Sequence, residues 1–202
     1  MIKICNLLLW VHISIIPVFA QVKTYQFSSE SKISISGTSN LSDWTIEVKK
    51  IFGHVEMKNA VSRKTVLEKG DSFENVELRI DVRSMESGRG TTMDNRAHES
   101  LKGNEHPEIV FTSRKSEVKE SINKQQGVFE LFVVGDLQVA GMTKPIELLL
   151  EGKKNGNDFI FSGSKLLKMT DFDIKPPTAM FGQIVAGDEV TVKFEDLILI
   201  VK

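Results

Sequence analysis

Histidine exchanges protons near neutral pH, so its positions are the first test for acid–base chemistry. After residue 20 the chain has three histidines, His54, His98 and His106. No serine stands in a G-x-S-x-G turn of the kind that presents a nucleophile. The spacing of His98 and His106 matches no metal-ligand motif. We therefore interpret the histidines as surface or turn residues, and we expect no metal site.

Carboxylates and glycines give no stronger catalytic signal. The chain has 27 Asp and Glu residues, but no spacing among them selects a pair for glycoside hydrolysis. Gly88-Arg89-Gly90 is too short for a phosphate-binding loop and does not follow a strand into a βαβ unit. The sequence thus predicts a protein that is not an enzyme and that needs no cofactor.

The first 20 residues differ in composition from the rest of the chain. Lys3 precedes an apolar run that opens at residues 7–11 and reaches Phe19, and residues 18–20 (VFA) offer a cleavage site. This pattern is typical of a secretory signal peptide, and the run is short for a membrane span, which takes about 20 apolar residues. We expect cleavage after Ala20, leaving one domain over residues 21–202 in the periplasm or the secreted fraction.

Charge and cysteine content narrow the class further. Cys5, the only cysteine, lies in the predicted leader, so the exported domain must be stable without disulfides. The formal net charge of −1 disfavours nucleic acid as a partner, because phosphate binding needs a basic face. About 180 residues are enough for one domain with a sizeable core. A homodimer is left open.

Residues 131–150 (LFVVGDLQVAGMTKPIELLL) give the clearest structural pattern. Apolar residues alternate in both halves of this segment, which indicates two strands with one face against an apolar interior. Residues 140–145, with glycine and proline, are expected to form the turn between them. The sequence predicts a long β-hairpin here.

Further alternating segments predict about eight strands in all. They lie at residues 31–36, 43–57, 76–83, 108–113, 159–164 and 190–201. A slip of phase at Lys49-Lys50 predicts a β-bulge. Residues 92–101 fit a short helix, whereas residues 59–72 and 166–187 are expected to be irregular. The spacing indicates an antiparallel sandwich or barrel, and the long first segments favour an eight-stranded barrel with one short helix.

Alternation directs eleven large side chains toward one interior. They are Trp44, Ile46, Leu78, Ile80, Ile109, Phe111, Leu131, Val133, Ile146, Leu148 and Phe194. An eight-stranded barrel can be filled by such side chains or can hold one small ligand. The periodicity leaves both possibilities open.

Several motifs resemble the YceI-like proteins. The hairpin residues 135–137 (GDL) and 141–145 (GMTKP) are similar to the G-x-L-x-x-x-G-x-T-K-P hairpin of that family. Residues 98–101 and 106–111 (HPEIVF) resemble its helix and its following strand, and residues 171–174 and 187–190 resemble its closing segment. The resemblance implies an extended, lipocalin-like antiparallel barrel that is exported to the periplasm and holds long amphiphiles such as polyisoprenoids.

Together, residues and resemblance predict a non-enzymatic protein that binds or carries a long-chain amphiphile, such as a polyisoprenoid, an isoprenoid quinone or a fatty-acid-like lipid. The eleven interior side chains are its expected ligand-binding residues. Arg96, His98 and Lys102, on or near the predicted helix, are candidates for contacts to a polar head group. The alternative is an exported structural or partner-binding barrel with a packed core.

Overall fold

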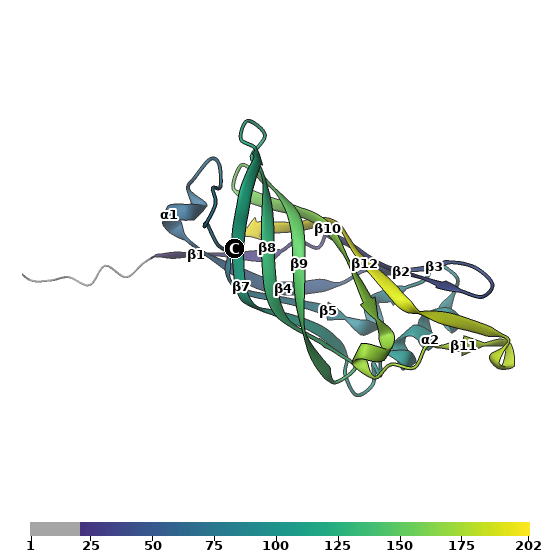
Figure 1. Ribbon diagram of the computed structural model, residues 1–202. Coiled ribbons are helices and arrows are strands. Elements are labelled where there is room, and N and C mark those ends of the chain that lie inside the picture. Colours follow the sequence, from purple (N-terminus) through teal and green to yellow (C-terminus); the bar gives the residue numbers. More distant parts are fainter. Residues whose placement is uncertain (1–20) are drawn as a thin grey trace, which may run out of the picture.

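The computed structural model describes residues 21–202; the predicted signal peptide, residues 1–20, lies outside the described residues. Eight antiparallel strands close into an elongated barrel (Figure 1). In ring order these strands are β1 (Val22–Phe27), β4 (Ile51–Lys58), β5 (Glu74–Asp81), β7 (Glu108–Asn123), β8 (Val128–Val139), β9 (Met142–Asn155), β10 (Asp158–Lys168) and β12 (Ile184–Val201). Pairing of β12 with β1 closes the ring.

Short segments lengthen the barrel at one end. They are β2 (Lys32–Ser39), β3 (Trp44–Val48), β6 (Met85–Glu86) and β11 (Thr178–Ala179). The first half of β12 pairs with β2, and its last residues pair with β1. Likewise β3 lies between β2 and β6, whereas β4 lies between β1 and β5. The prediction of a β-bulge at Lys49-Lys50 within one long strand was wrong, because these two residues separate β3 from β4 and the chain changes its pairing partners there.

The predicted hairpin is formed by β8 and β9, with a tighter turn than expected. Ala140 and Gly141 alone make the turn, at φ values of 49° and 85°, the positive values of a type I′ hairpin. Residues 142–145, predicted as part of the turn, belong to β9 instead. Pro145 fits there because β9 pairs with β10 only as far as Leu150 and Gly163, so its outer edge needs no donor at residue 145.

Other differences from the predicted elements follow from polar or interrupted patterns. β1 was not predicted, although its Tyr25 and Phe27 are buried. β7 continues ten residues past the predicted end, through a polar stretch with three register shifts that disturb the alternation. Residues 166–187, predicted to be irregular, contain the end of β10, all of β11 and the start of β12.

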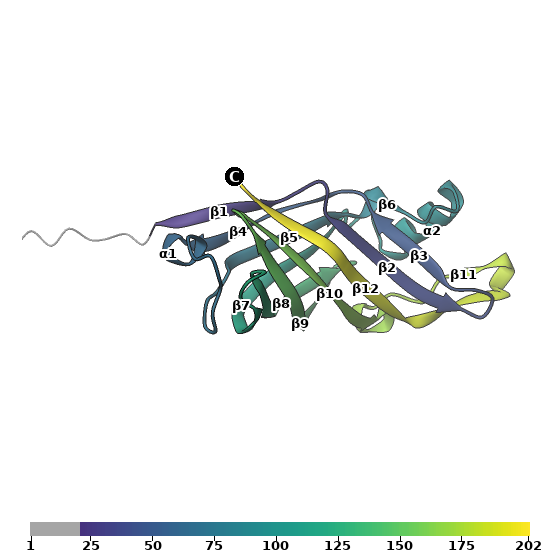
Figure 2. The same ribbon diagram turned by 90° about the horizontal axis from the view of Figure 1, so that it is seen from above.

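Two helices lie at opposite ends of the barrel (Figure 2). The helix α2 (Thr91–Ser100) matches the prediction for residues 92–101, and α1 (Asn59–Ser62) is a single turn in the segment expected to be a loop. Within residues 21–202, no helix is long and apolar enough to cross a membrane.

An aromatic cluster closes the barrel at the α1 end. Its members are Tyr25, Phe73, Phe129, Phe159 and Phe161, all at most 4% exposed, with most ring pairs edge to face. The loop after α1 seals this end: Lys64 Nζ lies 2.8 Å from Asp71 Oδ1, and the Val118 amide donates to the Asp71 carbonyl at 2.8 Å. Lys154 Nζ also donates to the Ser62 carbonyl, at 2.6 Å.

Gly152 on β9 makes this cluster possible. A Cβ at this position would overlap the Phe129 ring and would come within 3.0 Å of Phe161. The ring therefore occupies the space that any other side chain would need.

We expect Gly152→Val to lower the free energy of unfolding by about 1–3 kcal/mol, the usual cost of overpacking. The same substitution at the neighbouring, outward-facing Lys153 should change it by less than about 0.5 kcal/mol. Urea unfolding of both variants measures this, and equal losses would show that the cluster does not depend on the glycine.

Candidate functional site

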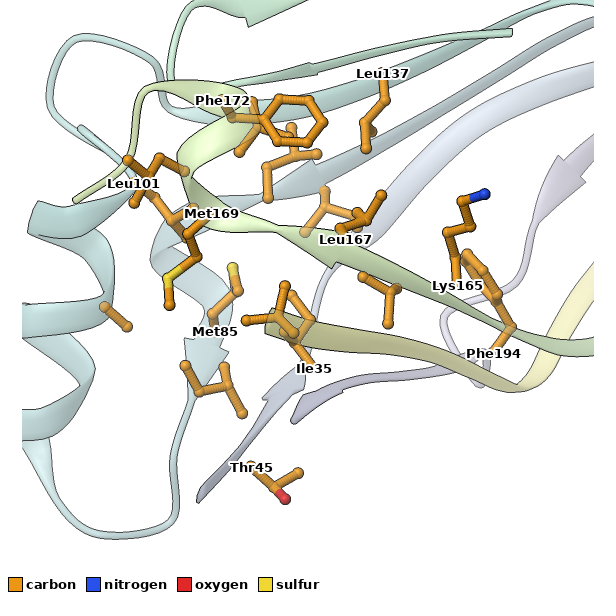
Figure 3. Close-up of a pocket in the computed structure, with 18 of the residues that line it drawn as sticks. Ile35, Thr45, Met85, Leu101, Leu137, Lys165, Leu167, Met169, Phe172 and Phe194 are labelled. Carbon is orange, nitrogen blue, oxygen red and sulfur yellow. The ribbon is translucent and has the colours of Figure 1, made fainter. Parts of the chain in front are cut away.

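An elongated apolar cavity of about 340 Å³ occupies the barrel between the aromatic cluster and α2. On β12 its wall extends from Ile184 to Leu199. At about 3.3 Å per residue, these 15 steps span roughly 50 Å along the strand. Figure 3 shows side chains from several strands pointing into this space, among them Leu137 on β8 and Leu167 on β10. The interior is therefore long and narrow, not fully packed.

All eleven side chains that alternation directed inward lie in the wall of this cavity. They are Trp44, Ile46, Leu78, Ile80, Ile109, Phe111, Leu131, Val133, Ile146, Leu148 and Phe194. Trp44 is fixed by its indole Nε1, which donates to the Thr38 carbonyl at 3.0 Å, and its ring covers Gly37. The structure brings these residues together, and their contact with a ligand stays a prediction.

Two segments cover the cavity at the end away from the aromatic cluster. The first is α2, whose Met93, Ala97 and Leu101, spaced four apart, all line the cavity. The second is the 3₁₀ turn η2 (Met169–Phe172), which contributes Met169 and Phe172 (Figure 3). A helix and a turn thus complete the enclosure where the strands end.

Hydrogen bonds to two carboxylates that do not line the cavity hold both covers. The Asp94 carboxylate accepts hydrogen bonds from the Ser87 hydroxyl and amide at 2.6 and 2.7 Å, which lowers the pKa of Asp94. At η2, the Thr170 hydroxyl and amide donate to Asp188 at 2.7 and 2.9 Å and likewise lower the pKa of that carboxyl. These charge-assisted bonds fix the covers without placing an acid inside.

The rim at this end is apolar and exposed. The side chains of Leu41, Met180 and Phe181 are 71%, 62% and 108% exposed. Asn40 joins the β2–β3 turn to the start of β12, since its Nδ2 donates to the Gln183 carbonyl at 2.8 Å and its Oδ1 accepts from the Val185 amide at 2.9 Å. Exposed apolar side chains therefore lie near the covered end of the cavity, and one of them, Leu41, also lines it.

Of the three head-group candidates, only Arg96 lines the cavity. His98 is turned toward β6, where its Nε2 lies 2.9 Å from the Met85 carbonyl oxygen. Lys102 follows α2 and forms an ion pair with Asp173 at 3.8 Å. These two residues fix α2 and the segment after η2.

The cavity is also lined by three basic residues that were not predicted as site residues from the sequence: Arg89, Lys165 and Lys168. Lys165 continues the inward alternation of Phe161 and Gly163, but the predicted strand stopped one residue before it, at Ser164. Extending β10 by four residues would have found both lysines on the strand.

The described residues gather no metal-binding cluster. Across residues 21–202, no three His, Cys, Asp or Glu side chains lie close enough to hold a metal ion. His54 pairs with Glu77 in the β4–β5 register. Its neighbours in the strand face the barrel interior, so the His54 side chain faces outward. What the arrangement offers is an apolar enclosure with a few cations in its wall.

Comparison with known proteins supports this architecture. The YceI-like domain model matches residues 22–196. No curated protein matches the sequence significantly.

Three solved structures are similar in fold. BcnA of Burkholderia cenocepacia has 18% identity and a TM-score of 0.61, covering 84% of this chain and 96% of its own. A polyisoprenoid-binding domain of Saccharophagus degradans, implicated in plant cell wall breakdown, has 13% identity and a TM-score of 0.62, covering 90% and 100%. A YceI protein of Campylobacter jejuni has 19% identity and a TM-score of 0.55, covering 78% and 84%.

Truncation of a side chain to alanine should lower the free energy of unfolding by different amounts at the two ends of the barrel. Phe159→Ala, in the fully packed cluster, should lower the free energy of unfolding of delipidated protein by about 3–5 kcal/mol. Leu137→Ala should cost less than about 2 kcal/mol, because one side of Leu137 already borders empty space. Urea unfolding compares the two, and a loss at Leu137 as large as that at Phe159 would mean that the interior is packed throughout.

Proposed function

The chain belongs to the YceI-like domain family, and we propose that it binds and carries a long-chain amphiphile in its barrel without transforming it. The ligand class is a polyisoprenoid, an isoprenoid quinone or a fatty-acid-like lipid. The observation that carries the proposal is the long apolar cavity, walled by all eleven side chains that alternation turns inward. The name of the Saccharophagus degradans neighbour, a polyisoprenoid-binding domain, agrees with this class.

The shape of the cavity favours a chain over a compact ligand. Burial of one methylene is worth about 0.8 kcal/mol, so a chain gains affinity with each carbon that it places along the wall. The aromatic cluster closes one end, and α2 and η2 cover the other. A ligand held here would be shielded from water over most of its length.

Carriage through water is the role that suits such a ligand. The predicted signal peptide would export the domain to the periplasm or beyond, where a long-chain amphiphile is almost insoluble. The exposed rim of Leu41, Met180 and Phe181 would be the place where the apolar chain enters.

A chain-length series tests the proposal by thermal unfolding. A ligand that binds only the folded state at a hundredfold excess over Kd adds about 2.7 kcal/mol, which corresponds to a rise in Tm of about 5–10 °C for a domain of this size. We expect the rise to grow with chain length from C8 to C16 and beyond. If no chain of any length or head group raises Tm, the packed-core, partner-binding alternative takes its place.

Adjacent leucines on β9 provide a matched pair of variants. Leu148 is 7% exposed and lines the cavity, whereas Leu149 is 53% exposed and faces outward. Leu148→Trp should fill the cavity and abolish most of the ligand-induced rise in Tm, while Leu149→Trp should preserve it. Equal rises in the two variants would place the binding site outside the barrel.

A further inference from the structure

Lys165, half-buried on β10, is one of the cations that line the apolar cavity, and from it we infer the charge of the ligand. This inference rests on the proposed function. The structure points to Lys165 Nζ as the group that meets an anionic oxygen of the amphiphile, a carboxylate or a phosphate. A neutral quinone or alcohol would not supply this partner.

The direction of Lys165 follows from the pairing of β10. Phe161, Gly163, Lys165 and Leu167 alternate on one face of the strand, and all but Gly163 line the cavity. Lys165 is paired with Val192, which also lines the cavity. Figure 3 shows the Lys165 side chain on the same side of β10 as Leu167, beside Phe194. The side chain of Lys165 therefore leaves the strand among apolar residues of the cavity wall.

Within residues 21–202, Lys165 has no ion pair and no hydrogen bond from its ammonium. Two half-buried lysines at the closed end are different: Lys64 pairs with Asp71, and Lys154 donates to the carbonyls of Ser62 and Lys64. An ammonium in apolar surroundings is costly unless it is paired. Lys165 alone among these three lacks the oxygen that would offset this cost.

The rest of the wall has the same sign of charge. The cavity is lined by four basic residues, Arg89, Arg96, Lys165 and Lys168, and by no Asp or Glu of the described chain. The whole sequence has 26 basic and 27 acidic residues, so composition does not explain this imbalance. A cavity with cations and no acids favours an anionic ligand.

Lys165 lies close to the point where two strands of the sheet separate. β9 and β10 pair from their shared turn to Leu150 and Gly163, and beyond that point they part. Lys165 is the first inward residue after this separation. The proposed head group would lie at this level of the cavity wall, where Lys165 lines it.

The test compares ligands that share a chain and differ in charge. Binding of palmitate, hexadecanol, geranylgeranyl phosphate and geranylgeraniol is measured by calorimetry on delipidated protein. We expect Lys165→Met to weaken the acid and the phosphate about tenfold or more, the loss of a hydrogen bond to a charged group. The two alcohols should change by less than about threefold, and Lys165→Arg should retain anion binding.

Controls separate the site from general charge. Lys153→Met removes the same charge from an exposed position on β9, and it should leave every affinity unchanged. Arg96→Met removes the cation of α2 and should cost less than Lys165→Met. Preference of the wild type for the phosphate over the carboxylate identifies an isoprenoid phosphate, and the reverse preference identifies a fatty acid.

The melting temperature of the ligand-free protein provides a second test that does not depend on ligand binding. Because Lys165→Met removes an unpaired charge at nearly constant volume, the ligand-free variant should melt above the wild type. If it does not fold, Lys165→Gln takes its place in the binding series.

The inference is overturned if Lys165→Met weakens acids and alcohols alike, leaves both unchanged, or if only Arg96→Met weakens the acids. Failure of the wild type to bind any of the four ligands would instead overturn the proposed function. The two failures are therefore distinguishable.

Discussion

Closure of the sheet is the constraint on which the rest of the structure depends. Eight strands joined edge to edge direct every second side chain into one interior, and the strand count sets how wide that interior is. The number of strands leaves the length free. Here two positions in the ring are each occupied by two successive strands, β1 followed by β2 and β3 followed by β4. The barrel wall therefore becomes longer while the width of the barrel does not change. An interior of this shape can be filled with rings at one end and left open along the rest.

The two ends of the barrel are closed in different ways. At the α1 end, aromatic rings need more width than the backbone spacing gives, and Gly152 supplies it by leaving room for Phe129. At the α2 end the strands diverge and cannot close over their own interior. A helix and a turn, fixed by Asp94 and Asp188 from outside, cover that end. The two carboxylates do not line the cavity, so the described wall contains no acid.

The spacing of apolar residues in the sequence predicted the fold well, but it predicted the candidate site only in part. The β8–β9 hairpin, α2 and the inward direction of the eleven wall residues all follow from alternation and helical spacing. β1 was missed because only Tyr25 and Phe27 of its six residues are buried, too few to form a clear alternation, and the second half of β7 because its register shifts break the alternation. The alternation of apolar residues predicts to which face of the sheet a side chain points. It does not predict the distance from that side chain to the opposite wall of the barrel. For that reason Leu148 and Phe194 could be assigned to the interior, but a cavity could not be told from a packed core.

The head-group residues show a second limit. Arg96, His98 and Lys102 lie within seven positions, yet the helix turns only Arg96 toward the cavity, and the other two bind Met85 and Asp173. Lys165 has the stronger placement and lay one residue beyond the predicted end of its strand. A charged residue inside a strand weakens the very pattern that would reveal it, so functional positions of this kind are found from pairing and not from hydrophobicity.

The central claim is that this barrel carries a long-chain amphiphile. Native mass spectrometry of the protein purified from its own host, followed by organic extraction, tests it most directly. The account predicts a mass excess equal to about one long-chain amphiphile per barrel, released by the solvent and identifiable in the extract. A protein that has the mass of the bare chain, and keeps it after incubation with fatty acids, isoprenoid phosphates and quinones, would contradict the claim.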